Sequence, residues 1–525
     1  MCKRDRVCFA FMSGGHTLRV IRRSQLLGVA AAAAVLLTAV PNPSPAVAAD
    51  SGLPRVGHVW TILLENEDYL ESTTVDLLGG SAYLTKTLAA RGARVPNYFG
   101  TGHSSLDNYI SMISGQGPTD NSQGDCSDDS VVGGSYTKST FDRYGQALGK
   151  PADVAKGDAG CVYAADVPTL VNQLDAKKLA WRGYMEDVDA DPTHLRTTCQ
   201  AARWSSQLNA AKGARSSTPN DYKRKHDPVV YFHSITGLAP ASGKPYDTAG
   251  HAPAKLCDAN EVPLSHLYSD LKKPAAQVPS WSFITPDQCD DGHDNPCSDG
   301  RVGGVVQIDR FLPGVVDAIT SSAAFRQDGL LIVTFDEGSE ALACCNEQRS
   351  PNLAPGNDNG GVGGLSTDPV PAARGGGQVG AIMLSPFIKP GTTSTECYNH
   401  YSYLRSMEDL FRIGATKAIP GTDNKGHIGY AGAPGQTVGG VAVPCQQMVS
   451  FGADIFTAAS VAGVTPVGKG TAVGGTQGSP TQGSGAASVS TPAGRSLATT
   501  GLAWQLPTAA FGLLALLLVR RATRA

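Results

Sequence analysis

One short apolar run that ends abruptly in two polar residues most constrains the fold of this chain. The run covers residues 59–64, and Glu65 and Asn66 follow it directly. A buried strand of a parallel sheet reads as a continuous apolar run rather than an alternating one. In open α/β sheets, ligands bind at the carboxyl ends of the strands. The sequence therefore predicts a carboxylate and an amide oxygen at the ligand-binding edge of a sheet.

Other segments extend this pattern along the chain. Further strands are predicted at 229–233, 281–284, 330–335 and 379–384. Helices are predicted at 83–91, 167–178, 264–272, 305–321 and 403–411. Strands that alternate with helices predict an α/β fold, with a doubly wound, mostly parallel sheet and helices on both faces. Residues 346–377 are crowded with Gly, Pro and Asn and are predicted to form a long surface loop and a candidate lid.

The amino-terminal segment, residues 1–49, reads as a signal peptide. Arg22 and Arg23 precede an apolar run, and small residues before Asp50 supply a cleavage site. The arginine pair half-resembles a twin-arginine signal, although Gln25 is polar where that pattern prefers an apolar residue. Export by the Sec or the Tat route therefore stays open.

The carboxyl terminus carries a second predicted targeting signal. Residues 497–501 read Leu-Ala-Thr-Thr-Gly, followed by an apolar run at 502–519 and a basic tail at 520–525. This arrangement resembles a sortase sorting signal, which implies cleavage after Thr500 and attachment to cell-wall peptidoglycan by a sortase. A simple membrane anchor is the alternative, because the apolar run is just long enough to span a bilayer. Both interpretations predict a protein tethered by its tail and facing outside, with the membrane contacted only through this segment.

Composition divides the rest into a stalk and a folded part. Residues 458–496 are dominated by Gly, Ser, Thr, Pro and Ala, which is typical of a flexible stalk that cannot bury enough surface to fold. Residues 50–457 remain and are predicted to form one large catalytic domain. The formal net charge of −3 and the lack of a basic tract give no sign of nucleic-acid binding.

The cysteines predict disulfides. Of the 12 cysteines, Cys2 and Cys8 lie in the predicted signal peptide, and an even number remains. An even number in an exported chain indicates disulfides rather than zinc ligands. Local pairs are expected at Cys126–Cys161, Cys289–Cys297 and Cys397–Cys445. The adjacent Cys344 and Cys345 are expected to bond elsewhere rather than to each other.

Acidic residues collect at the predicted strand ends. Asp336 and Glu337 close the run at 330–335, and an acidic segment that includes Asp291 and His293 follows the run at 281–284. Carboxylates so close together repel one another unless a cation neutralises them. Carboxylates, an amide oxygen and imidazoles suit Ca²⁺, Mg²⁺, Mn²⁺, Fe or Zn²⁺. For any one acid a solvated loop or a helix cap is the alternative, but three acidic strand ends favour a divalent metal ion.

Ser105 is the candidate nucleophile. It begins a predicted helix, where backbone N–H groups and the positive helix end face an incoming anion. A metal at the same point would activate the hydroxyl without a histidine base. The alternative is that Ser104 or Ser105 only caps the helix. The Gly-x-Ser-x-Gly elbow is absent, which argues against a Ser-His-Asp hydrolase and favours a metal-assisted one.

His400 follows the strand predicted at 379–384 and lies between tyrosines. It could complete a metal site or donate a proton, and the alternative is a structural histidine. The same alternatives hold for His233 and His427.

Six motifs then occur in an order that resembles a known family. They are Leu-Glu-Asn at 64–66, Pro-Asn-Tyr-Phe at 96–99 with His-Ser-Ser-Leu-Asp-Asn-Tyr at 103–109, Asp-Gly-His-Asp at 291–294, Thr-Phe-Asp-Glu at 334–337, Leu-Ser-Pro-Phe-Ile-Lys-Pro-Gly at 384–391 and Tyr-Asn-His-Tyr-Ser at 398–402. Together they resemble the bacterial and fungal phosphoesterase family, which includes acid phosphatases and phosphatidylcholine-type phospholipases C. That family is similar to the wider alkaline phosphatase superfamily. The resemblance spans residues 56–430 and implies an alkaline-phosphatase-like fold.

The resemblance also implies roles for individual residues. Glu65 and Asn66 match the first metal-ligand pair of the family. Asp336 and Glu337 match its later acidic pair. Ser105 matches the nucleophile, which becomes transiently phosphorylated. The usual motif has His-Pro-Ser where this chain has His-Ser-Ser, so the preceding serine is an alternative, although the spacing to the following Asn-Tyr favours Ser105.

Looser analogies extend the site. Asp291, His293 and His400 occupy places where ligands or phosphate contacts of a second metal region fall in the superfamily. Asn121 could donate to a non-bridging phosphate oxygen. Glu337 stands where the superfamily has a histidine, which leaves one or two metal ions open.

The leading hypothesis is therefore an exported, cell-surface, metal-dependent hydrolase of phosphate esters. In it Ser105 attacks phosphorus and His400 or His293 protonates the leaving oxygen. A phosphatase is favoured over a phospholipase C because no long amphipathic stretch suits membrane binding. A non-catalytic, wall-anchored binding protein on the same fold is the alternative from another class, but a degenerate enzyme would be expected to have lost Glu65, Ser105 or Asp336.

Overall fold

The computed structural model describes residues 53–69, 80–126, 130–189, 222–237, 255–338, 342–345, 347–357, 375–417, 419–433 and 448–457. The predicted signal peptide, stalk, sorting motif, apolar segment and basic tail lie outside these ranges, as does most of the predicted loop at 346–377. Within them, no helix has the length and apolar character needed to cross a membrane.

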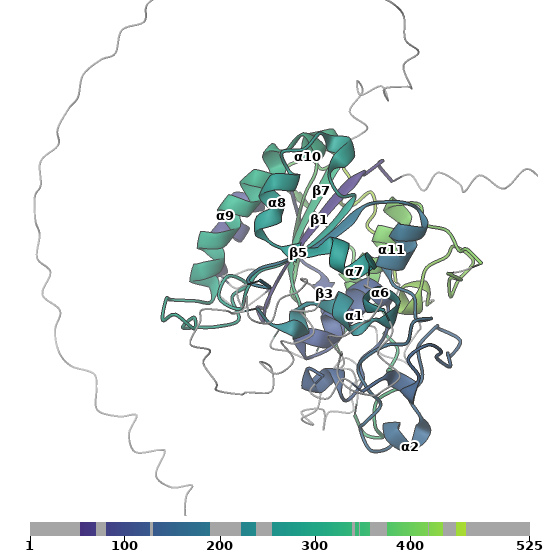
Figure 1. Ribbon diagram of the computed structural model, residues 1–525. Helices are drawn as coiled ribbons and strands as arrows, with labels where there is room; N and C mark the ends of the chain where they lie inside the picture. Colours follow the sequence, from purple (N-terminus) through teal and green to yellow (C-terminus); the bar gives the residue numbers. More distant parts are fainter. Residues whose placement is uncertain are drawn as a thin grey trace, which may run out of the picture. The chain divides into compact units, whose positions relative to one another are not determined.

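An eight-stranded sheet organises the fold (Figure 1), with the strand order β5-β4-β6-β1-β7-β8-β2-β9. Its strands are β1 (His58–Leu64), β2 (Ala93–Val95), β4 (Trp181–Met185), β5 (Glu261–Pro263), β6 (Trp281–Thr285), β7 (Gly329–Phe335), β8 (Ala381–Leu384) and β9 (Thr392–Thr393). The run from β5 to β7 is parallel, and β8 pairs antiparallel with both β7 and β2. A small second sheet pairs β3 (Tyr98–Phe99) with β10 (Tyr398–Asn399) in parallel. The predicted mostly parallel sheet is confirmed.

The two central strands are apolar because both of their faces are covered. Every residue of β1 and of β7 is buried. They pair in parallel from His58 opposite Gly329 to Leu64 opposite Phe335. Full burial of each large aliphatic side chain contributes about 1.5–3 kcal/mol, which fixes this register. Because both strands end at the same level, the residues that follow them leave the sheet side by side.

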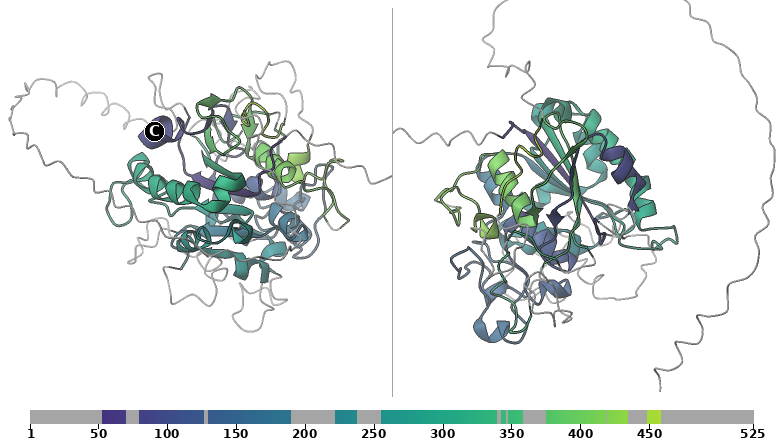
Figure 2. Two further views of the ribbon diagram at one scale, coloured as in Figure 1. Left: turned by 90° about the horizontal axis from the view of Figure 1, so that it is seen from above. Right: turned by 180° about the vertical axis from the view of Figure 1, so that it is seen from behind.

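Helices cover both faces of the sheet, as predicted. The longer ones are α1 (Ser105–Ser114), α3 (Leu170–Ala176), α9 (Val305–Ser321) and α11 (His400–Leu410). The shorter ones are α2 (Pro151–Val154), α6 (His233–Thr236), α7 (Lys255–Asn260), α8 (Ser265–Asp270), α10 (Ala323–Asp328), the π-helix η2 (Tyr83–Leu88) and the 3₁₀ turns η3 (Ser122–Gly124), η4 (Val132–Gly134), η5 (Arg224–His226), η6 (Pro228–Tyr231), η7 (Ala275–Gln277) and η8 (Gly429–Gly432). The views in Figures 1 and 2 place α9 on one face and α11 on the other. Helix α1 packs against α11 and α3.

Capping explains where two of the predicted helices begin. Helix α11 starts earlier than predicted because the side chain of Asn399 accepts a hydrogen bond from the Ser402 N–H. Helix α3 is shorter than predicted because Thr169 and Asn172 form a reciprocal capping box. Helix α9 has the predicted bounds.

The prediction of a strand at 229–233 is wrong. This segment forms η6 and the start of α6 instead. Pro228 fixes the backbone at the start of η6 and removes a donor that a strand ladder would need. The segment is apolar because it is buried in the core, and a short apolar run does not by itself separate strand from helix.

Two of the three predicted disulfides are observed, and the prediction for the adjacent cysteines is not met. The pairs Cys126–Cys161 and Cys289–Cys297 are confirmed. Cys397 is disulfide-bonded, and its predicted partner Cys445 lies outside the described residues. The prediction that Cys344 and Cys345 bond elsewhere is wrong, because they bond to each other. The backbone at Cys345 is left-handed (φ 65°), which turns the chain there, and both side chains are buried against Phe99.

Candidate active site

Three buried carboxylates meet at one edge of the sheet. Glu65 follows β1, Asp336 follows β7, and Asp291 lies in the loop after β6. The N–H of Asp336 donates to the carbonyl of Leu64 at 2.9 Å, and the N–H of Glu65 donates to the carbonyl of Asp291 at 3.0 Å. All three acids are 0% exposed. The strand ends that the sequence predicted to converge do converge.

Backbone groups hold Asp336 in place. Its Oδ1 accepts hydrogen bonds from the N–H groups of Asn66 at 3.0 Å and of Glu337 at 2.6 Å. Asn66 makes its contact from a left-handed backbone (φ 60°), and its side chain is exposed. The structure therefore brings the Asn66 backbone to the site, whereas its amide as a metal ligand stays a prediction.

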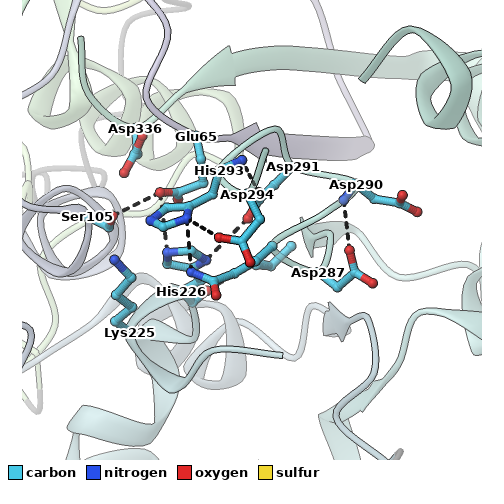
Figure 3. A network of polar contacts seen from close by, with 12 residues as sticks. Glu65, Ser105, Lys225, His226, Asp287, Asp290, Asp291, His293, Asp294 and Asp336 are labelled. Atoms are coloured by element: carbon cyan, nitrogen blue, oxygen red, sulfur yellow. Dashed lines mark hydrogen bonds and ion pairs between the residues drawn. The ribbon is translucent and has the colours of Figure 1, made fainter. Parts of the chain in front are cut away.

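Ser105 faces this edge from the first residue of α1 (Figure 3). Its hydroxyl donates to Glu65 Oε2 at 2.9 Å, and the hydroxyl of Tyr109, one turn further along α1, donates to Glu65 Oε1 at 2.7 Å. Ser104 precedes the helix but makes no side-chain cap, and its hydroxyl donates to the carbonyl of Gln123 instead. Of the two serines, Ser105 is the one directed at the carboxylates.

His226 completes the group, and the sequence analysis missed it. Its Nε2 lies 3.3 Å from Glu65 Oε2, and its Nδ1 lies 3.3 Å from Asp291 Oδ2. The ring stacks on Tyr109 with centroids 5.2 Å apart and an interplanar angle of 7°. His226 ends the short turn η5, far from any strand end, so its only sequence signal was a histidine just ahead of the buried run that begins at Pro228.

We call these residues the acid–histidine cluster: Glu65, His226, Asp291, Asp336 and Glu337. Burial raises the pKa of Asp291 and of Asp336 well above the usual range, and the neighbouring Glu65 raises both further. Burial and the nearby Asp336 raise the pKa of Glu337 in the same way. Burial lowers the pKa of the His226 imidazole, and the ammonium of Lys225 adds to this effect. Asp291, Asp336 and Glu337 thus resist ionisation, and the His226 imidazole resists protonation.

The cluster fits a divalent cation. Glu65, His226 and Asp291 offer ligand atoms that all lie within 4.8 Å of one another. Several polar atoms here are buried and have no hydrogen-bond partner among the described residues, namely His226 Nε2, Asp291 Oδ2, Asp336 Oδ2 and Glu337 Oε2. Leaving such an atom unsatisfied costs about 1–3 kcal/mol, and a bound cation would satisfy several at once. A second group, Asp287, Cys289 and Asp290, is less suited, because Cys289 is bonded to Cys297 and has no thiolate to offer.

His293 lies at the exposed side of the cluster. Its backbone N–H donates to Asp291 Oδ1 at 2.8 Å, and its ring Nδ1 lies 2.8 Å from Asp294 Oδ1. The ring is 6.0 Å from that of His226, and the side chain is 28% exposed. This position combines access to solvent with contact to the cluster.

The other two predicted site residues are placed differently. His400 is fully buried behind Asp336, with Nε2 2.7 Å from the Asp336 carbonyl and Nδ1 3.2 Å from the Tyr98 hydroxyl. Burial lowers its pKa to about 4. Asn121 uses its amide within its own loop, donating to Asp158 at 3.2 Å and accepting from the N–H of Gly160 at 2.8 Å. The structure does not bring Asn121 into contact with the cluster.

The structure is thus a mostly parallel α/β sheet that gathers a serine hydroxyl, buried carboxylates and an imidazole at one edge. Residues 79–414 match the sequence profile of the phosphoesterase family. The chain belongs to this family, so the resemblance seen in its motifs is confirmed.

Curated relatives are phosphatases. The chain is 26% identical over 305 residues to a phosphate-repressible acid phosphatase of Penicillium chrysogenum, an alignment that covers 57% of this chain and 52% of that protein. It is 24% identical over 409 residues to a phosphatidylinositol-3-phosphatase of Mycobacterium tuberculosis, covering 77% of this chain and 94% of that protein. The chain thus spans about half the length of the Penicillium relative.

Among solved structures, the chain is also similar to a protein of the alkaline phosphatase superfamily from Vibrio parahaemolyticus. It is 11% identical, with a TM-score of 0.34, and the match covers 68% of this chain and 67% of that one. A phosphonate monoester hydrolase from Silicibacter pomeroyi is 12% identical, with a TM-score of 0.33, covering 68% and 74%.

Proposed function

We propose that this protein is a metal-dependent hydrolase of phosphate esters that uses Ser105 as its nucleophile and forms a phosphoserine intermediate. The observation that carries the proposal is the hydrogen bond from the Ser105 hydroxyl to Glu65 Oε2 at 2.9 Å, inside the acid–histidine cluster. Membership of the phosphoesterase family supports the reaction class.

The residues divide the reaction between them. The Ser105 oxygen attacks phosphorus as its proton passes to Glu65 Oε2, the atom to which it already donates. The bond to the leaving oxygen breaks, and His293, which is 28% exposed and lies close to Asp294, supplies the proton that this oxygen takes up. Water then attacks the phosphorus of the phosphoserine and gives its proton to His293, while the Ser105 oxygen leaves and takes back the proton held by Glu65. The start of α1 directs backbone N–H groups and the positive helix end toward the phosphate oxygens.

Glu65, His226 and Asp291 would hold the cation, with Asp336 and Glu337 beside them. When bound, a divalent ion supplies Lewis-acid stabilisation of the negative charge that develops on the phosphoryl oxygens. His400 contributes by position, since it supports the backbone of Asp336 from behind.

The substrate we propose is a phosphomonoester. Acid phosphatases among the relatives support this choice, and the mycobacterial relative carries the name of an enzyme that removes a phosphate from a lipid headgroup. Export and tethering outside the cell through residues 497–501 belong to the same proposal and are supported by the two terminal signals in the sequence. Replacement of Thr500 tests the sorting signal. Loss of wall attachment would support it, and unchanged attachment would exclude it.

The function is tested with purified protein and three substrates. Hydrolysis of p-nitrophenyl phosphate, of bis-p-nitrophenyl phosphate and of phosphatidylcholine is measured with and without chelator. We expect fast cleavage of the monoester that is lost on chelation, and a fall of at least about 10³-fold in kcat for Ser105→Ala. Ser104→Ala is the matched control and should keep its activity. Full activity of Ser105→Ala would exclude Ser105 as the nucleophile. Faster cleavage of phosphatidylcholine than of the monoester would favour a phospholipase C. No activity of the wild type on any of the three substrates would favour a non-catalytic binding protein.

A further inference from the structure

A positively charged side chain, that of Lys225, lies beside the acid–histidine cluster and has no role in the reaction steps proposed above. Lys225 belongs to η5 and directly precedes His226, and its side chain is only 15% exposed. Figure 3 shows it extending toward Ser105, on the same side as His226. A buried lysine that points at a nucleophile requires a partner for its charge, because burying an unpaired ammonium is costly.

Its one hydrogen-bonded partner among the described residues leaves most of the ammonium unused. Lys225 Nζ lies 3.3 Å from Asp125 Oδ2, and that is a single contact for a group with three donors. Asp125 is itself held by the chain: its N–H donates to the Ser122 carbonyl at 2.9 Å, and Cys126, the next residue, is bonded to Cys161. The ammonium is therefore fixed on one side and free to donate on the side of Ser105.

Electrostatics couple this ammonium to the site. The ammonium of Lys225 interacts electrostatically with Asp125, Glu65 and Asp336. The carboxyl groups of the cluster offer no attraction to an anionic substrate, because the energy between two charges follows the sign of their product. A phosphate that approaches Ser105 therefore gains from the ammonium of Lys225 beside it.

We propose that Lys225 donates to a non-bridging oxygen of the substrate phosphate and makes the site selective for phosphomonoesters over phosphodiesters. The selectivity follows from the different charges of the two substrate classes. A monoester carries close to two negative charges at neutral pH and a diester carries one, so the same ammonium attracts the monoester about twice as strongly. This inference rests on the proposed function and adds the residue that selects the substrate class.

The test separates selectivity from a structural role. The values of kcat/KM for p-nitrophenyl phosphate and bis-p-nitrophenyl phosphate are measured for the wild type, Lys225→Met and Lys225→Arg. We expect Lys225→Met to lose about 100-fold on the monoester and less than about tenfold on the diester. Lys225→Arg keeps the charge and should recover much of the monoester activity. Lys156→Met is the control for a lost positive charge, because Lys156 is exposed and lies just after α2.

A direct binding measurement guards against variants that fold poorly. Calorimetry with inorganic phosphate, in the presence of the activating cation, should show binding at least about tenfold weaker for Lys225→Met than for Lys156→Met. Asp125→Asn is a second variant, which removes the anchor and should weaken phosphate binding less than Lys225→Met does.

Equal losses on both substrates, or unchanged phosphate binding in Lys225→Met, would overturn the proposal. A different result would be that the wild type cleaves neither ester while phosphate binding still depends on Lys225. The proposed function and the selectivity of Lys225 would then both be refuted, but the contact between Lys225 and phosphate would be supported.

Discussion

Replacing Tyr109 with phenylalanine tests whether Glu65 must be held in place for catalysis. The Tyr109 hydroxyl donates to Glu65 Oε1 at 2.7 Å, and both side chains are fully buried. The other oxygen, Oε2, accepts the bond from Ser105. Phenylalanine keeps the ring, so the stacked contact with His226 at 5.2 Å remains. The substitution therefore removes one hydrogen bond and little else.

The size of the effect follows from that bond. A buried hydrogen bond to a charged acceptor contributes about 1.5–3 kcal/mol. Without it the Glu65 carboxylate is free to turn away from Ser105, and the bond that orients the nucleophile is lost. If the whole contribution is realised in the transition state, kcat falls about 10- to 150-fold, because 1.36 kcal/mol is a factor of ten. We expect KM to change little, since neither group binds the leaving part of the substrate.

The assay needs a variant that loses the same kind of bond elsewhere. Tyr184→Phe is that control, because its hydroxyl donates to Asp270 Oδ2 at 2.8 Å between β4 and α8, outside the acid–histidine cluster. Steady-state rates on p-nitrophenyl phosphate and urea unfolding are measured for both variants. Both should lose unfolding free energy, and Tyr109→Phe alone should lose kcat. Wild-type kcat in Tyr109→Phe, or an equal loss in Tyr184→Phe, would refute the argument that Tyr109 positions Glu65.

Three further predictions concern the nucleophile, the cation and pH. Brief incubation with ³²P-labelled phosphomonoester followed by acid quenching should leave label on the wild type and none on Ser105→Ala, and label on that variant would exclude the serine. A divalent cation should raise the melting temperature of the wild type but hardly that of Asp291→Asn, because a ligand that binds only the folded state stabilises it; equal shifts would place the cation elsewhere. Burial lowers the pKa of His427, but Asp409 and Asp423 outweigh it and raise that pKa from 6.5 to about 9. Protonated His427 therefore stabilises the fold fully below pH 6.5, and this stabilisation is lost as the pH rises through 9. The free energy of urea unfolding should fall by about 2–3 kcal/mol between pH 6 and 10 in the wild type but not in His427→Gln. The same fall in His427→Gln would show that another group causes it.

The strand ends were predictable because they depend on local sequence and on one rule of sheet architecture. A continuous apolar run of this length is buried on both faces, and parallel neighbours end at the same edge. Those two facts bring Glu65 and Asp336 together without any knowledge of the connecting segments. Ser105 was predictable for a similar reason, since helix starts have their own sequence signals and α1 begins there.

His226 and Lys225 could not be predicted in this way. They lie in η5, a single turn with no periodicity, and η5 reaches the site only because it packs on α1. Contacts between segments so far apart in sequence depend on the whole fold. Asn121 shows the converse: its local setting suited a phosphate contact, yet Asp158 and Gly160 occupy its amide.

Of the two residues that the sequence did not reveal, His226 would contribute a ligand for the cation and Lys225 contributes a positive charge. Glu65, Asp291 and Asp336 are fully buried, and when ionised they and Glu337 would repel a phosphate dianion from the helix start where Ser105 lies. A cation held by the carboxylates and His226 would remove part of that repulsion, and the ammonium of Lys225 attracts the dianion as well. Because the ionised carboxylates that hold the cation also face the phosphate, we expect phosphate affinity to depend on the cation, and by thermodynamic linkage cation affinity then rises with phosphate to the same extent. The acidic character of the site is therefore compatible with an anionic substrate only when both sources of positive charge are present.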